Sequence, residues 1–285
     1  MLTSTASVHR ARTLDEALAL RVAHPEATVI AGGTDVMVFL EAGVIHPTAF
    51  LDLWGCRELR GIDPAGSRIG ALTTWSDVAR HPALPDALRA CARTVGAVQI
   101  QNRGTVGGNI VNASPAGDSL PLWLALDATF VLAGPGGERR VAAEDFWTGY
   151  RATVLAPDEL LVAVELPART YTTGGAQRLH YRKVGTRLAQ AISKVVLGAR
   201  LHVEDGIVRE ARVALGSVAP VPVRARKLER ALVGRAIDPD AAVQVLADIR
   251  PIDDVRSTAT YRRRVTERVV RSWLAAEAAS GIHSG

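Results

Sequence analysis

Residues 100–119, the glycine-rich segment, constrain the fold of this chain more than any other stretch. The residues that favour turns crowd together there: Gly104, Gly107, Gly108, Asn109, Asn112, Ser114, Pro115 and Gly117. Because these residue types disfavour regular elements, the sequence predicts neither a continuous helix nor a continuous strand. Loops of this length are uncommon in compact domains unless they bind a ligand. The alternative is a long surface loop that binds nothing.

The chemistry of this segment favours a phosphate and a sugar. Between Thr105 and Asp118 the chain offers many backbone and side-chain donors and a single carboxylate. Glycines let the backbone approach a ligand closely, and successive N–H groups bind anions. We therefore expect donors for a diphosphate, with Asp118 accepting a hydrogen bond from a ribose or ribityl hydroxyl.

A second glycine motif lies in residues 29–36, the turn segment. A short β-branched run at 28–31 ends at Gly32 and Gly33, and an apolar run from Asp35 to Leu40 predicts a helix directly after them. The N–H groups of such a turn and the start of a helix attract anions. Taken alone, the motif also fits a turn whose glycines serve geometry only. Neither segment is a G-x-G-x-x-G fingerprint or a P-loop, so a dinucleotide here requires a different fold.

The remaining pattern predicts an α/β region followed by a small α+β domain. Thr13 and Glu16 form a capping-box pattern before a helix that ends at Pro25. Further helices are expected at 74–80, 85–95 and 120–126, and strands at 50–53, 67–71, 129–133 and 160–166. After a linker at 170–175, strands are expected at 180–183, 193–203 and 207–215, then helices at 222–232, 239–246 and 258–279.

Charge and residue types argue against several functional classes. Lys and Arg number 34 and Asp and Glu 29, a net charge of +5, but the arginines are scattered, so we expect no nucleic-acid partner. Cys56 and Cys91 are too few for an iron–sulfur cluster, and no H-E-x-x-H pair is present, so we expect no metal. No nucleophile elbow is found, and we predict no catalytic residue.

The cysteine count and the first residues of the chain indicate where the protein is expected to be located. Two cysteines cannot build a disulfide framework, and residues 1–12 lack a secretory signal, so a cytoplasmic protein is expected. The most apolar run, Leu120 to Leu132, is too short for a membrane span.

Arg262, Arg263 and Arg264 lie on the last helix, whose apolar stripe is expected at Tyr261, Val265, Val269 and Trp273. They predict a solvated or partner-facing basic surface.

Taken together, the two glycine motifs resemble those of a known family. Ala31-Gly32-Gly33-Thr34-Asp35, followed by Thr105-Val106-Gly107-Gly108-Asn109, resembles the FAD-binding medium subunit of molybdenum hydroxylases, relatives of xanthine dehydrogenase and aerobic carbon monoxide dehydrogenase. Further similar motifs span nearly the whole chain: 69–74, 109–118, 158–167, 181–183, 192–195, 216–220, 222–225 and 259–263.

The resemblance implies an α+β fold and a set of cofactor contacts. It implies a two-part FAD-binding domain of the vanillyl-alcohol oxidase / p-cresol methylhydroxylase type at 1–170, divided near residue 53 into 1–53 and 54–170, and a small α+β domain at 176–281. Two runs would surround the diphosphate: Val29, Ile30, Ala31, Gly32, Gly33, Thr34, Asp35 and Val36, then Thr105, Val106, Gly107, Gly108 and Asn109. Ser114 joins the site, and Asp118 takes a sugar hydroxyl.

At the flavin end, the resemblance implies four contacts. Leu161 and Lys183 would touch the flavin half, and Val36 and Ile192 would lie near the isoalloxazine ring. A cation at Lys183 would favour the anionic reduced flavin; a surface lysine is the alternative interpretation.

The resemblance also implies a role within a larger complex. FAD would be bound non-covalently, while molybdopterin and [2Fe-2S] clusters would reside in a large and a small partner subunit. The chain would take electrons from the iron–sulfur subunit and pass them to NAD, a quinone or oxygen. The alternative is a self-sufficient FAD-dependent oxidase or reductase of the same fold. A nucleotide-binding or regulatory module without flavin is a third possibility, and it requires the glycine motifs to be structural.

Overall fold

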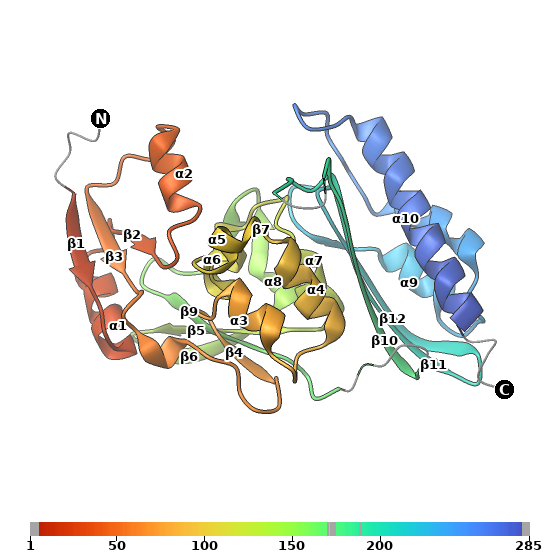
Figure 1. The fold of residues 1–285 in the computed structure, drawn as a ribbon, viewed down its shortest axis with the longest axis horizontal. Coiled ribbons are helices and arrows are strands. Elements are labelled where there is room, and N and C mark those ends of the chain that lie inside the picture. The colour runs from red at the N-terminus through yellow and green to blue at the C-terminus, as the bar shows by residue number, and fades with distance from the viewer. Residues whose placement is uncertain (1–5, 170, 172–174, 188–189, 281–285) are drawn as a thin grey trace.

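The computed structural model describes residues 6–169, 171, 175–187 and 190–280. These residues form three units in a row: an N-terminal unit, a central unit and a C-terminal unit (Figure 1). Buried apolar side chains gather in three clusters along this row. Within the described residues, no helix combines the length and the continuous apolar character that crossing a bilayer requires.

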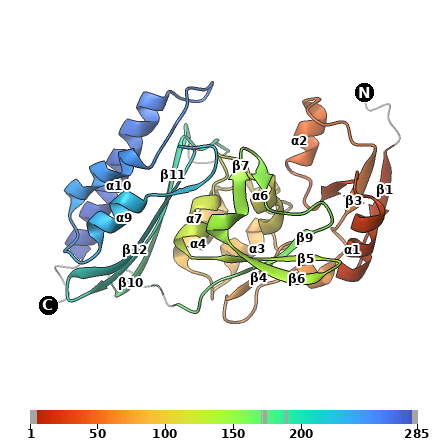
Figure 2. The same ribbon diagram turned by 180° about the vertical axis from the view of Figure 1, so that it is seen from behind.

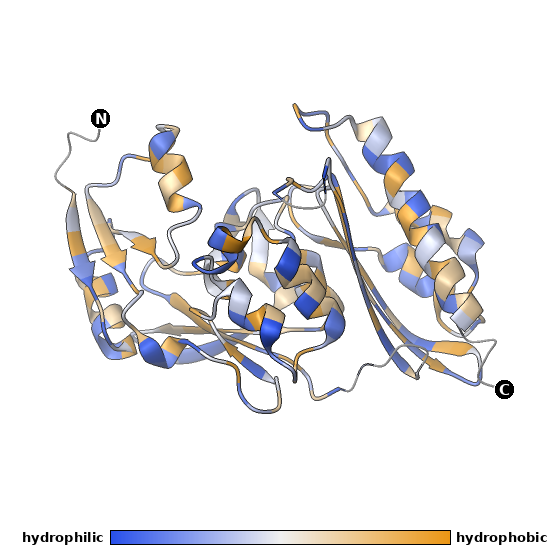
Figure 3. Cartoon of the chain, in the orientation of Figure 1, coloured by the Kyte–Doolittle hydropathy of each residue, from blue (hydrophilic) through white to orange (hydrophobic). Residues whose placement is uncertain are grey.

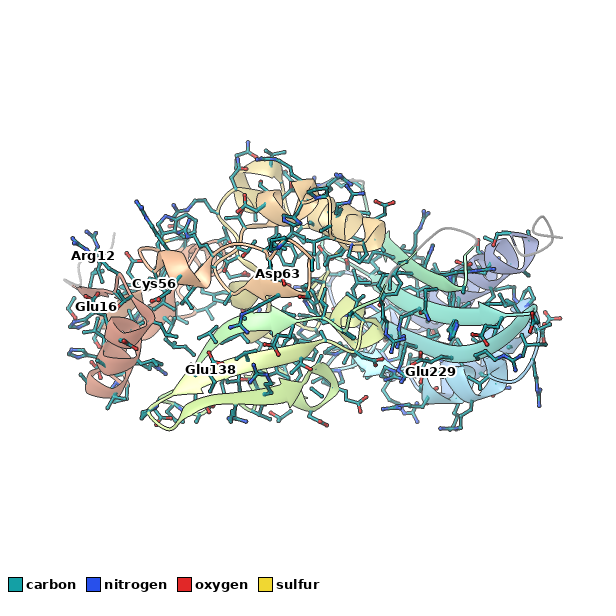
Figure 4. All side chains as sticks on the ribbon, turned by 90° about the horizontal axis from the view of Figure 1, so that it is seen from below. Arg12, Glu16, Cys56, Asp63, Glu138 and Glu229 are labelled. Atoms are coloured by element: carbon teal, nitrogen blue, oxygen red, sulfur yellow. The ribbon has the colours of Figure 1, made fainter. Side chains whose placement is uncertain are left out.

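The N-terminal unit is a small parallel sheet with the order β1-β3-β2. Its elements are β1 (Ser7–Arg10), α1 (Leu14–Ala23), β2 (Thr28–Ile30), α2 (Val36–Glu41), β3 (Ala49–Asp52) and the 3-10 turn η1 (Arg57–Leu59). Thr13 caps α1 by accepting from the Glu16 N–H, as predicted. The Glu16 carboxylate instead accepts from the N–H of Arg12, beside which it lies in Figure 4. The predicted capping box is therefore only half formed.

The central unit is an antiparallel sheet, β4-β9-β5-β6, covered on one face by helices (Figures 1 and 2). Its strands are β4 (Arg68–Gly70), β5 (Thr129–Gly134), β6 (Gly137–Ala142), β9 (Leu160–Glu165) and the pair β7 (Trp147–Gly149) and β8 (Ala152–Thr153). Its helices are α3 (Trp75–Arg80), α4 (Asp86–Thr94), α5 (Val98–Gln101), α6 (Val106–Asn112), α7 (Leu120–Ala125) and α8 (Ala143–Phe146). Alternate residues of β5 enter different cores: Phe130 and Leu132 pack beneath the helices, and Val131 and Ala133 join the N-terminal core.

The glycine-rich segment is more regular than the sequence predicts. It contains the end of α5 and all of α6, whose second and third residues are glycines. Thr105 caps α6, and a Cβ at Gly107 would lie 2.7 Å from the Ala71 Cβ. Close packing against residue 71 therefore offsets the weak helix propensity of glycine, which local sequence cannot reveal.

The C-terminal unit is an antiparallel sheet, β10-β11-β12-β13, with helices on the face away from the central unit (Figures 1 and 2). Its elements are β10 (Gln177–Val184), β11 (Val195–Glu204), β12 (Ile207–Gly216), β13 (Val223–Arg224), α9 (Arg226–Leu232), the 3-10 helix η2 (Pro239–Ala247) and α10 (Ala259–Ser280). The opposite face of the sheet contacts α4 and α7. The sequence predicts one helix at 222–232. In the structure, residues 223 and 224 form β13 because they pair with β12, and α9 begins only at Arg226.

The predicted basic surface on α10 is wrong at Arg262. This side chain is 5% exposed and donates to the Asp254 carboxylate at 2.7 Å. The buried face of α10 runs through residues 262, 266, 270, 273 and 274, which leaves Tyr261 exposed and Val265 and Val269 partly buried. The pairing partner at residue 254 comes from the preceding loop, so the helical pattern alone could not indicate it.

His180 links stability of the C-terminal unit to pH. It stacks on Trp273, and burial, assisted by Arg182, lowers its pKa from 6.5 to about 4. His180 therefore becomes protonated near pH 6.5 in the unfolded chain but only near pH 4 in the folded chain. The stability that neutral His180 contributes is complete above pH 6.5 and is lost as the pH falls through this window, by roughly 2–3 kcal/mol.

The measurement is urea unfolding of the apoprotein at several pH values between 6.5 and 4. His180→Phe keeps a neutral ring against Trp273 and should flatten the fall in stability over this range. An identical slope for the two proteins would assign the pH dependence to other groups.

Candidate functional site

A cavity of about 570 Å³ lies between the N-terminal and central units. Its volume is in the range of small-molecule and cofactor sites. It is lined by twelve of the eighteen predicted cofactor contacts: Val29, Ala31, Gly32, Gly33, Thr34, Asp35, Val36, Thr105, Gly107, Gly108, Asn109 and Leu161. The structure thus brings the turn segment and the glycine-rich segment to one cavity.

Residues of the turn segment that line this cavity have unpaired backbone donors. In the part of the chain that the structure describes, the N–H groups of residues 33–36 have no hydrogen-bond acceptor, whereas the carbonyl oxygens of Gly33 and Asp35 accept from the first residues of α2. Gly33 has φ +77°, a conformation that favours glycine. Consecutive unpaired N–H groups in such a turn form a binding site for an anion.

The glycine-rich segment contributes differently from what the sequence predicts. The N–H groups of residues 106 and 107 donate to the carbonyl oxygens of Thr73 and Ala71, at 3.0 and 2.8 Å. Those of residues 108 and 109 donate to the side chain and the carbonyl oxygen of Thr105, both at 3.1 Å. These backbone donors are therefore already satisfied within the protein. Gly108 instead allows a ligand to approach the backbone closely. Outside the backbone of its own helix, the Thr105 hydroxyl is the only described atom within 4 Å of an added Cβ.

The two segments touch each other directly at Gly32. A Cβ at this position would lie 1.9 Å from the carbonyl oxygen of Arg103. The same arginine stacks its guanidinium on Trp54, 3.7 Å from the ring centroid, and Arg60 stacks on this indole at 3.9 Å. This cation–π sandwich joins the end of the N-terminal unit to the glycine-rich segment beside the contact at Gly32.

Asp35 places a carboxyl group in the lining. Burial raises its pKa, against the lowering effects of Arg151 and of a hydrogen bond with Asn112. Arg151 also donates to Asn112 at 2.7 Å and lies over the Phe39 ring. A carboxyl group held in this way can accept a hydrogen bond from a sugar hydroxyl.

Six predicted site residues do not line the cavity: Ile30, Val106, Ser114, Asp118, Lys183 and Ile192. Val106 is fully buried in the central core, and Ile30 packs 3.4 Å beneath the Cβ position of Gly33. Ser114 accepts from the nearby N–H of Ala116, and Ile192 is 54% exposed. The side chain of Val106 therefore serves packing, while the assignment of the other residues as cofactor contacts stays a prediction.

Asp118 and Lys183 form a buried ion pair between the central and C-terminal units. The Lys183 Nζ donates to Asp118 at 2.6 Å and to the carbonyl oxygen of Thr94 at 2.9 Å. The Ser193 hydroxyl donates to the second Asp118 oxygen at 2.5 Å. Burial raises the pKa of Asp118, and Lys183 opposes this shift. The pair holds β10 against the glycine-rich segment, and its predicted contacts with a sugar hydroxyl and a flavin remain to be tested.

Comparison with known proteins identifies the family. The model of the FAD-binding domain in molybdopterin dehydrogenases matches residues 4–169, and that of the carbon monoxide dehydrogenase flavoprotein C-terminal domain matches residues 180–276. The chain belongs to this family of molybdopterin dehydrogenase FAD-binding subunits. The family and the fold class predicted from the sequence are confirmed.

Individual relatives are similar over nearly their whole length. The xanthine dehydrogenase FAD-binding subunit of Escherichia coli O157:H7 is 33% identical over 288 residues, covering 95% of this chain and 97% of the relative. The glyceraldehyde dehydrogenase medium chain of Sulfolobus acidocaldarius is 31% identical over 268 residues, covering 90% and 93%. Among solved structures, a carbon monoxide dehydrogenase from Hydrogenophaga pseudoflava matches with a TM-score of 0.91 at 30% identity, covering 98% of this chain and 99% of that one.

The residues of this FAD-binding subunit fit the cofactor. The unpaired N–H groups of residues 33–36 suit a diphosphate, Gly108 leaves space for it, and Asp35 suits a sugar hydroxyl. Apolar side chains suitable for flat rings complete the lining: Val29, Leu53, Leu72, Val95, Ile100, Leu155, Leu160 and Leu161.

Sequence reasoning missed part of the lining. Several residues contribute to the cavity without belonging to either glycine motif: Arg21, Leu53, Trp75, Thr153, Leu155, Ala156 and Pro157. They come from separate elements, and their neighbouring residues form no recognisable ligand-binding motif. No signal in the sequence marks them, because only the packing of the two units brings them together.

Gly108→Val tests the cavity without opening the core. The added side chain would occupy the space where the backbone lies open, so we expect FAD affinity to fall at least about 100-fold. The apoprotein should lose no more than about 1 kcal/mol, since only the Thr105 cap must adjust. Flavin titration and urea unfolding measure the two quantities. Full flavin retention by this variant would contradict the assigned site.

Proposed function

We propose that this subunit passes electrons from an iron–sulfur subunit to an external acceptor through non-covalently bound FAD. Bound flavin supplies one-electron and hydride chemistry. The chain's own residues bind the diphosphate, orient the rings and enclose them in an apolar cavity. The observation that carries this proposal is the run of unpaired N–H groups at residues 33–36, which belong to the lining of a cavity between two units.

The proposal assigns the remaining chemistry to partner subunits. The chain has two cysteines, both buried and free, whereas a [2Fe-2S] cluster requires four ligands. Relatives bear the names of medium chains of dehydrogenases that differ in substrate. We therefore place the molybdopterin in a large subunit and the iron–sulfur clusters in a small one, and the substrate pocket outside this chain.

The first test is the visible spectrum of the purified chain, with the released chromophore identified by mass. We expect FAD at close to one molecule per chain, released on denaturation without a covalent link. A colourless protein that takes up no added FAD would overturn the proposal.

The second test addresses the partners and the acceptor. Co-expression with a large and a small subunit should give a stable complex in which substrate reduces the flavin. Stopped-flow mixing of the reduced complex with NAD, a quinone or oxygen then identifies the acceptor by its reoxidation rate. Substrate turnover by the isolated chain would instead favour a self-sufficient oxidase or reductase.

A further inference from the structure

Arg151 stands at the tip of the turn between β7 and β8, in a backbone conformation that its residue type rarely adopts. Its φ is +51°, in the left-handed region that favours glycine. Residues held in this conformation cost free energy, and they gather at ligand clamps and functional sites. The turn by itself would favour glycine here, which indicates that the arginine side chain has a role of its own.

The Arg151 guanidinium reaches from the central unit to the N-terminal unit. It donates to the Asn112 side chain at 2.7 Å, and its central carbon lies 4.7 Å from the centroid of the Phe39 ring in α2. Burial raises the pKa of Asp35, at the start of α2, and the Arg151 charge opposes this shift. Asn112, Phe39 and Asp35 all line the cavity, whereas Arg151 does not belong to the lining. One side chain outside the cavity therefore contacts residues of both its walls.

Helix α2 is short and poorly buried. It has six residues, none of which is buried, and Met37 and Val38 are 55% and 61% exposed. Its residues are mostly hydrophobic (Figure 3), and it lies away from the β1-β3-β2 sheet in both views (Figures 1 and 2). A helix this short is not stable without tertiary contacts. Its position beside the cavity therefore depends on contacts such as the one between Phe39 and Arg151.

The position of α2 matters because its start carries part of the anion site. The N–H groups of residues 35 and 36 belong to the unpaired run at 33–36, and Phe39 lies one turn further along the helix. A movement of α2 would carry these donors with it. A cation over an aromatic ring and a hydrogen bond from a charged donor both stabilise the present arrangement. Holding a binding site in its bound geometry raises affinity, mostly by slowing dissociation.

We propose that Arg151 is a positioning residue that holds α2 against the glycine-rich segment and thereby slows the release of bound FAD. This inference rests on the proposed function, because it assumes that FAD occupies the cavity. It assigns Arg151 no contact with the cofactor, since the residue acts through Phe39, Asn112 and Asp35.

Arg151→Gly tests this role without straining the turn. The chain is loaded with FAD and diluted, and the release rate is followed by the fluorescence of free flavin. We expect release at least about 10-fold faster, the size of effect for a lost hydrogen bond to a charged group. Glycine suits this φ, which offsets the greater freedom of the unfolded chain, so the apoprotein Tm should stay within about 3 °C. Arg151→Lys keeps the charge but not the planar fork and should recover part of the loss.

Two further variants make the test specific. Asp205→Gly is the matched control, because Asp205 also has a positive φ, of +52°, with a side chain 94% exposed in the hairpin turn between β11 and β12. Its FAD release should stay within about twofold of that of the wild type. In a Phe39→Leu background, Arg151→Gly should accelerate release less than in the wild type, because the ring that Arg151 holds is absent.

Each other outcome has a defined meaning. Unchanged FAD release in Arg151→Gly would overturn the inference. Faster release together with a clearly lower apoprotein Tm would assign Arg151 to the stability of the turn and also overturn it. An equal acceleration with and without the Phe39 ring would contradict action through α2. A wild-type chain that binds no FAD would instead overturn the proposed function itself, so the two failures are distinguishable.

Discussion

Gly32→Ala is expected to yield a protein that no longer retains FAD. A single added methyl group at this position would lie 1.9 Å from the carbonyl oxygen of Arg103 and 2.6 Å from its carbon. Because the obstacle is backbone, no rotamer change can relieve it. The turn segment and the glycine-rich segment must then separate, which displaces the N–H groups of residues 33–36 from the opposite wall of the cavity. We expect a loss of at least about 3 kcal/mol of stability in addition to the lost flavin.

Flavin content per chain and urea unfolding measure these effects. Gly136→Ala is the matched control, because an added Cβ there meets nothing within 4 Å and its φ is not positive. Gly108→Val should differ from Gly32→Ala by losing the flavin while keeping most of its stability. If Gly32→Ala purifies with full flavin, the two segments do not meet as described.

Arg200→Met is expected to lower the free energy of unfolding by about 2–3 kcal/mol. The loss stays below the range for breaking a fully buried ion pair, because Asp127 and Glu210 are partly exposed and both keep Arg212 as a partner. The Arg200 side chain is 1% exposed and reaches from β11 into the central unit. It donates to the Ala125 carbonyl oxygen at 2.9 Å, to Asp127, and to Glu210 at 3.0 Å. Methionine fills similar space, so the loss of stability measures the missing hydrogen bonds and ion pairs to the two carboxylates and to the end of α7.

The measurement is urea unfolding of the apoprotein, followed by two probes. Arg209→Met is the control, since Arg209 lies on β12 with a side chain 47% exposed and forms ion pairs with Glu204 at 3.5 Å and Asp205 at 3.9 Å on the surface. Surface pairs of this kind contribute little, and we expect a change within about 0.5 kcal/mol. Equal losses in both variants would contradict the role of Arg200 in joining the central and C-terminal units.

Elements with strong local signals were predicted closely. The predicted strand at 28–31 is β2, and the predicted helices at 74–80, 85–95 and 258–279 match α3, α4 and α10 within one residue at each end. These segments combine caps, prolines and apolar periodicity, which are properties of neighbouring residues. β6 was missed because it is an exposed edge strand without apolar alternation, defined only by its pairing with β5.

The candidate site was likewise predictable only in part. Its two glycine motifs were recognised because close backbone approach requires glycine wherever it occurs. Which N–H groups remain free was not predictable: residues 106 and 107 donate to acceptors about 35 residues earlier in the chain, while residues 33–36 find none. The pairing of Asp118 with Lys183, 65 residues apart, likewise depends on how β10 docks.

The sequence by itself determined the positions of the glycine turns, the family and most of the regular elements, because these depend on residue type and local spacing. The tertiary structure decided how the donors are used, which residues line the cavity and which charges are buried. Arg21, Arg200 and Arg262 are chemically alike in the sequence. One lines the cavity, one joins two units and one is paired inside the C-terminal unit. The physical reason is that the environment of a charge is set by whatever packs around it, and those groups come from distant parts of the chain.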